Sequence, residues 1–253
     1  MISLRDKIVV VTGASKGIGA AIAELFAADG ARVVLTARSK SALDESLSRL
    51  GGERKRHLVV RADLRKQTDL KRVISLSRKS FGRIDIWINN AGVGAHKPVT
   101  ETSEREYDAI MDTNVRAVFY SLRALVPVFR GQKEDADGCR GQIINISSSA
   151  ARIGVPNLAV YSASKGALNL LSESVANEVR NEGIKISVFS PASTDTDLMR
   201  NLSKKKPNRA LSPSKASVKL TPLEVAEGVL FLAKQNVNAW TSFADIRPLS
   251  VRR

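Results

Sequence analysis

Two residues that could carry out acid–base chemistry, Tyr161 and Lys165, stand one helical turn apart in the stretch Tyr-Ser-Ala-Ser-Lys. On a helix this spacing puts both side chains on one face, so the ammonium can lie close to the phenol. A nearby positive charge favours the phenolate and lowers the pKa of a tyrosine from its ordinary value of about 10. Such a phenol could exchange a proton with a substrate. The pair alone does not identify a function, because the same spacing occurs by chance on many solvated helices.

Ser148 could complete such a site. It lies upstream of Tyr161, two residues after a predicted strand over residues 142–146. Tyr161 and Lys165 then fall near the start of a helical pattern over residues 158–181. From the end of its strand, the Ser148 hydroxyl could hold a carbonyl or alcohol oxygen against the phenol.

A glycine-rich turn supplies a second kind of chemistry. Residues 7–11 predict a strand, residues 20–28 a helix, and the sequence between them is Thr-Gly-Ala-Ser-Lys-Gly-Ile-Gly over residues 12–19. In this context the three glycines could make a tight turn, admit a pyrophosphate and pack the helix on the strand. The alternative is a purely structural turn. We predict a dinucleotide site whose residues include Gly13, Ser15, Lys16, Gly17, Ile18 and Gly19.

The end of the second predicted strand, residues 32–36, bears on which dinucleotide fits. Enzymes that use NAD usually carry an acid here for the ribose 2′-hydroxyl. This chain has Thr36 and Arg38 instead, and Lys16 lies in the glycine turn. Two cations and a small hydroxyl suit a 2′-phosphate, so we predict NADP(H) rather than NAD(H). The alternative is that Arg38 and Lys16 belong to the general surface charge.

Asp63 follows the third predicted strand, residues 57–61. Open α/β sheets bind ligands at the carboxyl ends of their strands, so Asp63 could contact the adenine of a dinucleotide. It could equally cap the loop before the helix predicted over residues 67–81. We include Asp63 among the predicted cofactor residues.

The fourth predicted strand, residues 84–88, leads into Asn-Asn-Ala-Gly at residues 89–92. Small residues here would let a ribose approach the backbone, and the amides could bond neighbouring strands. Asn90 and Gly92 are therefore predicted cofactor residues.

Asn114 lies inside a long helical pattern over residues 104–129, which is interrupted only near Pro127. Asparagine disfavours a helix interior unless its side chain has a task, such as orienting a water or a neighbouring backbone group. The alternative is an amide that is simply satisfied within the core.

Six predicted strands alternate with helical patterns, and the last of them covers residues 184–189. This order predicts a single α/β domain over residues 1–253, a Rossmann-like doubly wound parallel sheet with helices on both faces. The residues singled out above all lie just after a strand or early in the next helix. We therefore expect them to meet at one edge of the sheet.

The composition limits the remaining classes. The 40 Lys and Arg against 25 Asp and Glu give a net charge of +15, which attracts polyanions. The cations are spread along the chain without the aromatic residues of a single-strand stacking surface, so we expect a solvated basic surface and no nucleic-acid partner.

One cysteine, Cys139, rules out an internal disulfide, and together with two histidines it argues against a metal site. Cys139 falls in a predicted surface loop over residues 131–141 and is assigned no role. No apolar run approaches the roughly 20 residues of a membrane span, and no signal-peptide pattern opens the chain. We expect a soluble, cytoplasmic protein.

Taken together, the motifs resemble the short-chain dehydrogenase/reductase family over residues 7–246. They occur in the family's order and spacing: Thr12-Gly13-x-x-x-Gly17-x-Gly19, Asn89-Asn90-Ala91-Gly92, Asn114, Ser148 and Tyr161-x-x-x-Lys165. The resemblance implies that Tyr161 is the catalytic acid/base and that Ser148 positions the substrate oxygen. It further implies that Lys165 lowers the tyrosine pKa and binds the nicotinamide ribose, and that Asn114 holds a water in the proton relay.

Two departures from the family bear on its other contacts. The usual Pro-Gly after the sixth strand is here Pro191-Ala192, and alanine adopts a positive φ only at a cost. The cofactor contacts implied for Pro191 and Thr196 depend on this backbone. The ending over residues 243–249 also lacks the glycines of many ketoacyl reductases and looks more like that of NADP-dependent hydroxy-acid and carbonyl reductases.

The function expected from these observations is NADP(H)-dependent interconversion of a carbonyl and a secondary alcohol on a small molecule. One alternative is a 3-oxoacyl-[acyl-carrier-protein] reductase, since lysines at 204–206 would suit an acidic carrier protein. Another is a non-catalytic regulator that binds a dinucleotide or a polyanion. Residues 197–220 are expected to form a mobile flap over the substrate. The family suggests a homodimer or homotetramer joined through the helices of Asn114 and Tyr161.

Overall fold

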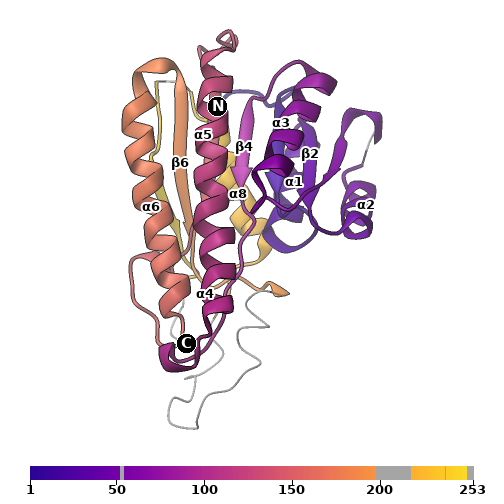
Figure 1. Ribbon diagram of the computed structural model, residues 1–253. Helices are drawn as coiled ribbons and strands as arrows, with labels where there is room; N and C mark the ends of the chain where they lie inside the picture. Colours follow the sequence, from indigo (N-terminus) through magenta and orange to yellow (C-terminus); the bar gives the residue numbers. More distant parts are fainter. Residues whose placement is uncertain (52–53, 198–217, 237, 250–253) are drawn as a thin grey trace.

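The computed structural model describes residues 1–51, 54–197, 218–236 and 238–249. Within them, a seven-stranded sheet has the order β3-β2-β1-β4-β5-β6-β7, and every neighbouring pair is parallel. Helices cover both of its faces (Figure 1). The predicted Rossmann-like, doubly wound fold in a single α/β domain is therefore confirmed.

Six of the strands agree with the predicted ones to within two residues at each end. The strands are β1 (Ile8–Thr12), β2 (Arg32–Ala37), β3 (Leu58–Arg61), β4 (Ile86–Asn89), β5 (Gly141–Ile146), β6 (Ile184–Pro191) and β7 (Phe243–Ile246). The sequence did not predict β7. It is a short edge strand whose residues stay partly exposed, so it lacks the continuous hydrophobic run of a strand buried on both faces.

Two layers of helices enclose the sheet. The helices are α1 (Gly17–Ala28), α2 (Lys40–Arg49), α3 (Gln67–Phe81), α4 (Glu104–Met111), α5 (Ala117–Arg130), α6 (Ala159–Val179) and α8 (Pro222–Ala233). Residues of α3, α5 and α6 share one hydrophobic core with the sheet, and residues of α1, α2 and α8 share the other. Figure 1 shows α5 and α6 lying side by side along the first face.

The sequence of β1 reflects this double burial. Its residues read Ile-Val-Val-Val-Thr and all five are buried. Ile8 and Val10 pack into the core under α3, α5 and α6, whereas Val9 and Val11 pack into the core under α1 and α8. Because successive side chains of a strand point to opposite faces, a strand covered on both sides needs hydrophobic residues at every position.

The prediction of one long helix over residues 104–129, interrupted only near Pro127, is wrong in one respect. The break falls at Asp112–Arg116, a π-helical segment between α4 and α5, and not near Pro127. Pro127 lies inside α5 on the exposed side, where the carbonyl that it leaves without a donor can face water. The π-segment instead carries the buried residue Asn114, and such segments often occur at functional sites.

A buried polar network ties the centre of the sheet to two helices. The Asn89 amide donates to Asn145 Oδ1 at 2.7 Å and to Ser121 Oγ at 2.8 Å, and it accepts from the Trp87 indole at 2.8 Å. Asn145 in turn donates to Ser172 Oγ at 2.8 Å. Strands β4 and β5 are thereby fixed to α5 and to α6, the helix that carries Tyr161 and Lys165.

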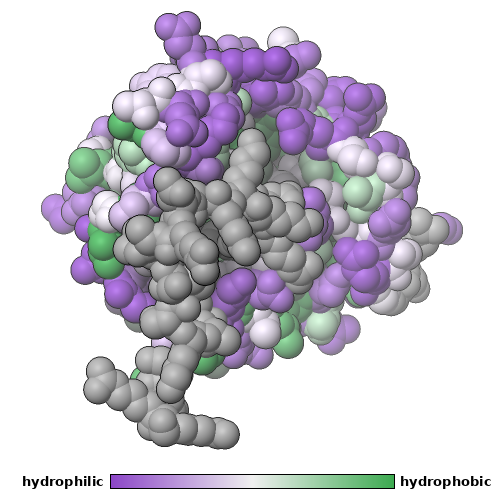
Figure 2. Space-filling view, turned by 90° about the horizontal axis from the view of Figure 1, so that it is seen from below, coloured by the Kyte–Doolittle hydropathy of each residue, from purple (hydrophilic) through white to green (hydrophobic). Residues whose placement is uncertain are grey.

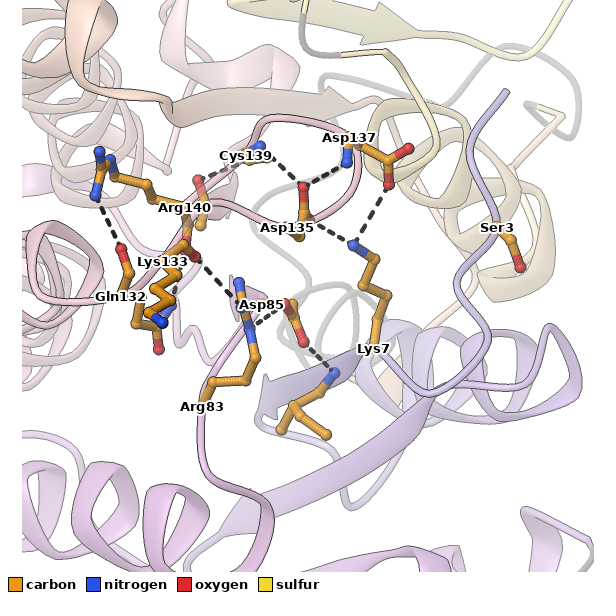
Figure 3. Close-up of polar contacts among 12 residues, drawn as sticks. Ser3, Lys7, Arg83, Asp85, Gln132, Lys133, Asp135, Asp137, Cys139 and Arg140 are labelled. Carbon is orange, nitrogen blue, oxygen red and sulfur yellow. Dashed lines mark hydrogen bonds and ion pairs between the residues drawn. The ribbon is translucent and has the colours of Figure 1, made fainter.

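A second polar network lies at the amino-terminal edge of the sheet (Figure 3). Lys7, just before β1, forms ion pairs with Asp135 and Asp137 of the loop before β5. Asp135 also accepts hydrogen bonds at 2.9 Å from the backbone amides of Asp137 and Cys139. The loop is thus closely bound to β1, and Cys139 is buried within it, not exposed as the predicted surface loop suggested.

These contacts shift the pKa values of Lys7 and Asp135. Burial lowers the pKa of Lys7, but the hydrogen bond and the charge of Asp135 outweigh it, so the pKa is raised overall. Burial raises the pKa of Asp135, but the bond with Lys7 and the backbone donors together lower it by more, so the net shift is downward. A carboxyl with a lowered pKa stabilises the fold above its unfolded pKa and loses that contribution as the pH falls through its folded pKa.

We predict that Lys7→Met lowers the free energy of unfolding at pH 7 by about 1–3 kcal/mol, because it leaves a mostly buried carboxylate without its cation. Denaturant unfolding monitored by circular dichroism measures this. Lys40→Met is the matched control, since Lys40 and Asp44 form an exposed pair that is worth about 0.3–0.5 kcal/mol. The Lys7 effect should shrink as the pH falls from the ordinary aspartate pKa through the lowered pKa of Asp135, because that carboxyl then becomes protonated. Equal losses in the two variants would contradict this role for Lys7.

Candidate functional site

A cavity of about 690 Å³ opens at the carboxyl ends of the strands. All but one of the predicted site residues line it. They are Gly13, Ser15, Lys16, Gly17, Ile18, Gly19, Arg38, Asp63, Asn90, Gly92, Ser148, Tyr161, Lys165, Pro191 and Thr196. Figure 2 views the molecule from this end, where the described surface is mostly hydrophilic with scattered hydrophobic residues. The exception is Asn114, which lies behind the cavity wall.

The glycine turn has the geometry that the sequence predicts. Gly13 and Gly17 have φ angles of +66° and +57°, in the region that favours glycine. Gly19 permits close packing, because a Cβ there would lie 2.4 Å from both the Gly13 carbonyl oxygen and the Asn90 amide nitrogen. The turn ends at the first residue of α1, so backbone N–H groups face the cavity where a pyrophosphate could bind. These residues fit a dinucleotide.

Asn90 holds the turn from the neighbouring strand. Its side chain donates to the Thr12 carbonyl at 2.8 Å, and its backbone amide donates to Thr12 Oγ1 at 2.9 Å. The prediction that these amides bond neighbouring strands is confirmed, since β1 and β4 are joined here just below the cavity. Gly92 lies beside Asn114 and Lys165: a Cβ there would make ordinary contacts with Asn114 Oδ1 at 3.4 Å and with Lys165 Nζ at 3.6 Å, so packing alone does not require glycine at this position.

Tyr161, Ser148 and Lys165 come together on the cavity wall. Tyr161 is 8% exposed, and the Ser148 hydroxyl lies close enough to its phenol to oppose the effect of burial on the phenol's pKa. Lys165 Nζ donates to the Ile146 carbonyl at 2.8 Å and lies 6.0 Å from the centre of the Tyr161 ring. The end of β5, the segment after it and the first turns of α6 therefore bring together a buried phenol, a buried ammonium and a half-buried hydroxyl.

The pKa values differ from the expectation. Burial raises the pKa of Tyr161, and the bond with Ser148 offsets this only in part, so the pKa is not lowered by Lys165 as the spacing suggested. Burial also lowers the pKa of Lys165 to about 8. Both shifts have one cause, the removal of a charged form from water. The phenol is therefore protonated at neutral pH and could donate its proton to a bound oxygen.

Asn114 is fully buried in the π-segment. Its amide exchanges two hydrogen bonds of 2.9 Å with the backbone of Val93 and donates a third of 3.0 Å to Ser164 on α6. Both amide hydrogens thus have protein acceptors, so the side chain joins the loop after β4 to the helix of Tyr161. The water-holding role of Asn114 stays a prediction.

The end of β2 matches the expected ligands only in part. Arg38 is exposed at the cavity, whereas Thr36, which also lines it, is fully buried. Lys16 forms an ion pair with Asp197 at 2.9 Å across the cavity mouth. Of the two predicted cations, Lys16 is therefore paired, whereas Arg38 takes part in none of the ion pairs between described residues.

Asp63 has a partner that the sequence reasoning missed. Its carboxylate forms a forked ion pair with Arg65, which also lines the cavity. Asp63 therefore does not cap α3, which was the alternative considered for it. The signal available was the position of Arg65 two residues after Asp63, at the same strand end, but its charge was attributed to the general basic surface.

The Pro191-Ala192 departure is accommodated without strain. Ala192 does not adopt a positive φ, and its amide donates to the Ile246 carbonyl of β7 at 2.9 Å. Thr196 remains near the glycine turn, with its methyl 3.5 Å from where a Cβ on Gly17 would lie. The predicted flap falls largely on residues 198–217, which lie outside the described residues.

A family model described as short chain dehydrogenase matches residues 7–207. The chain belongs to the short-chain dehydrogenase family. It is an oxidoreductase of that family, as the motifs led us to expect. An uncharacterized oxidoreductase of Staphylococcus saprophyticus is 30% identical over 251 residues, which cover 98% of this chain and 100% of that protein.

Two solved structures of the family are also similar. One, a metagenomic short-chain oxidoreductase in complex with NADP, is 34% identical with a TM-score of 0.79 and covers 98% of this chain and 100% of its own. The other, the 3-ketoacyl-(acyl-carrier-protein) reductase of Brucella melitensis complexed with NADH, is 30% identical with a TM-score of 0.84 and covers 96% and 98%. Solved structures similar to this chain thus include one bound to NADP and one bound to NADH.

None of the helices in the described part of the chain is both long and apolar enough to cross a membrane.

We predict that Gly19→Ala lowers the free energy of unfolding by about 1–3 kcal/mol, because the new methyl group overlaps the Gly13 carbonyl and Asn90. Gly166→Ala is the matched control, a helical glycine whose Cβ would lie an ordinary 3.5 Å from the Ala151 carbonyl. Alanine is favoured over glycine in a helix by about 0.5–1 kcal/mol, so Gly166→Ala should be neutral or stabilising. Thermal unfolding compares the two, and a harmless Gly19→Ala would refute the packing described here.

Proposed function

We propose that the chain catalyses NADP(H)-dependent interconversion of a carbonyl and a secondary alcohol by hydride transfer. The observation that carries the proposal is that Tyr161, Ser148 and Lys165 lie together on the wall of the cavity that the glycine turn lines. A dinucleotide bound there would supply the hydride, and the protein would supply orientation and proton transfer. The family assignment supports oxidoreductase chemistry in this cavity.

The three side chains divide the remaining chemistry. In the direction of reduction, the protonated Tyr161 phenol donates its proton to the oxygen that becomes the alcohol. Ser148 donates a hydrogen bond to the same oxygen and orients the carbonyl toward the cofactor. The Lys165 ammonium, held against the Ile146 carbonyl, stabilises the phenolate that this transfer leaves behind. Asn114 supports the group by fixing the loop after β4 to α6.

The preference for NADP(H) rests on Arg38, which lies at the end of β2 where an acid would select NAD(H). Lys16 could add its charge if its pair with Asp197 opens. The metagenomic relative bound to NADP agrees with this preference, whereas the Brucella reductase was solved with NADH.

The similarity to the Brucella protein also favours a second candidate, reduction of a 3-oxoacyl group on an acyl-carrier protein. An acidic carrier would be attracted by the net charge of +15. We further propose a homodimer or homotetramer, because neighbouring helices α5 and α6 expose Phe119 and Leu170, which are 42% and 68% exposed.

We predict that Tyr161→Phe lowers kcat by about 10²–10⁴-fold, the usual contribution of a positioned acid, and leaves the affinity for NADP⁺ nearly unchanged. NADPH oxidation is measured against ketones, aldehydes and 3-oxoacyl thioesters, and NADP⁺ binding by calorimetry. The control is Tyr107→Phe, since Tyr107 is exposed on α4 away from the cavity. A Tyr161→Phe protein that keeps most of its activity would exclude the proposed acid.

A further inference from the structure

A second charged group lies in the cavity, at the adjoining ends of β2 and β3. Arg65 Nε lies 2.9 Å from Asp63 Oδ1, and Arg65 Nη2 lies 2.6 Å from Asp63 Oδ2. The backbone amide of Arg65 also donates to Asp63 Oδ1 at 3.2 Å. A forked pair of this kind fixes the plane of a guanidinium, which a single contact does not. The mechanism proposed above uses neither side chain.

Backbone bonds bring this pair beside Arg38. The Ala62 amide donates to the Ala37 carbonyl at 2.9 Å, which extends the pairing of β2 and β3 beyond the strands. The Arg61 guanidinium donates to the Arg38 carbonyl at 3.1 Å. Arg38, Asp63 and Arg65 all line the cavity. Two arginines and one aspartate from neighbouring strand ends therefore line the same wall.

The charge balance of this wall favours an anion. Asp63 neutralises one of the two guanidiniums, so a net positive charge remains where an NAD-selective chain would carry an acid. The hydroxyl of Ser39 and the first turn of α2, which it caps, border the same part of the cavity. Lys16, the other cation predicted for this role, is instead paired with Asp197.

We propose that Arg65 is a specificity-determining residue for NADP(H): oriented by Asp63, it binds the 2′-phosphate together with Arg38. In this proposal the main role of Asp63 is to orient Arg65, and contact with the adenine is secondary. The inference rests on the proposed function, which it deepens. A pair that is only structural would have little effect on binding, because exposed ion pairs add little to stability and do not distinguish the two dinucleotides.

The test is equilibrium binding of NADP⁺ and NAD⁺ to the purified full chain, measured by calorimetry, so that no substrate is needed. In Arg65→Gln, the Kd for NADP⁺ should rise by about five- to twentyfold, since a charge-assisted bond at a part-exposed site is lost. The Kd for NAD⁺ should stay nearly constant. Arg65→Lys should keep part of the preference, because it retains the charge but not the fork.

Lys66→Gln is the matched control. Lys66 is the exposed neighbour of Arg65 and does not line the cavity, so its loss removes the same charge without changing the site. It should leave the ratio of the two Kd values near that of the wild type. Thermal unfolding of Arg65→Gln and Arg65→Lys shows whether either substitution disturbs the fold.

Two results would overturn the role of Arg65 and leave the proposed function intact. One is an unchanged preference for NADP⁺ in Arg65→Gln, and the other is an equal rise in the Kd values of both dinucleotides. A wild-type chain that binds neither dinucleotide would overturn the proposed function and this inference with it. The wild-type measurement therefore separates the two failures.

Discussion

The buried ammonium of Lys165 is the interaction on which the rest of the site depends. Moving a charged amine out of water costs several kcal/mol, so it must be compensated by fixed partners. The Ile146 carbonyl at the end of β5 supplies the direct contact at 2.8 Å. Gly92 lies next to it, since a Cβ there would be in ordinary contact with Asn114 Oδ1 at 3.4 Å and with Lys165 Nζ at 3.6 Å. The ends of β4 and β5, the π-segment and α6 thus meet around one charge.

The amino-terminal edge of the sheet contributes to stability, and the carboxyl edge carries the functional site. At the amino-terminal edge, Lys7 and Asp135 neutralise each other and bind a loop to β1. At the carboxyl edge, Lys165 and Arg38 have no carboxylate in a described ion pair, which leaves positive charge at the cavity. Between the two edges, the polar network around Asn89 and the two hydrophobic cores hold the strands together. The site can therefore carry uncompensated charge because the opposite edge and the centre stabilise the sheet.

The sequence predicts the features that local pattern determines. The strand of Val9 and its neighbours is continuously hydrophobic, and the three glycines follow it at a fixed spacing, so the fold and the cavity residues could be placed. Features that depend on packing could not. The raised pKa of Tyr161 comes from burial, which spacing on a helix does not report. The partner of Asp63 was missed because a basic chain offers many cations, and only the folded strand ends show that Arg65 is the one that binds.

The most direct test of the proposed chemistry is a crystal structure of the chain with NADP⁺. We predict the pyrophosphate on the glycine turn between Gly13 and Gly19, and the nicotinamide ribose within hydrogen-bonding distance of Tyr161 and Lys165. The nicotinamide ring would then face the Ser148 hydroxyl across the space for a substrate. A dinucleotide bound outside this cavity, or with its nicotinamide far from Tyr161, would contradict the assignment of this group as the catalytic centre.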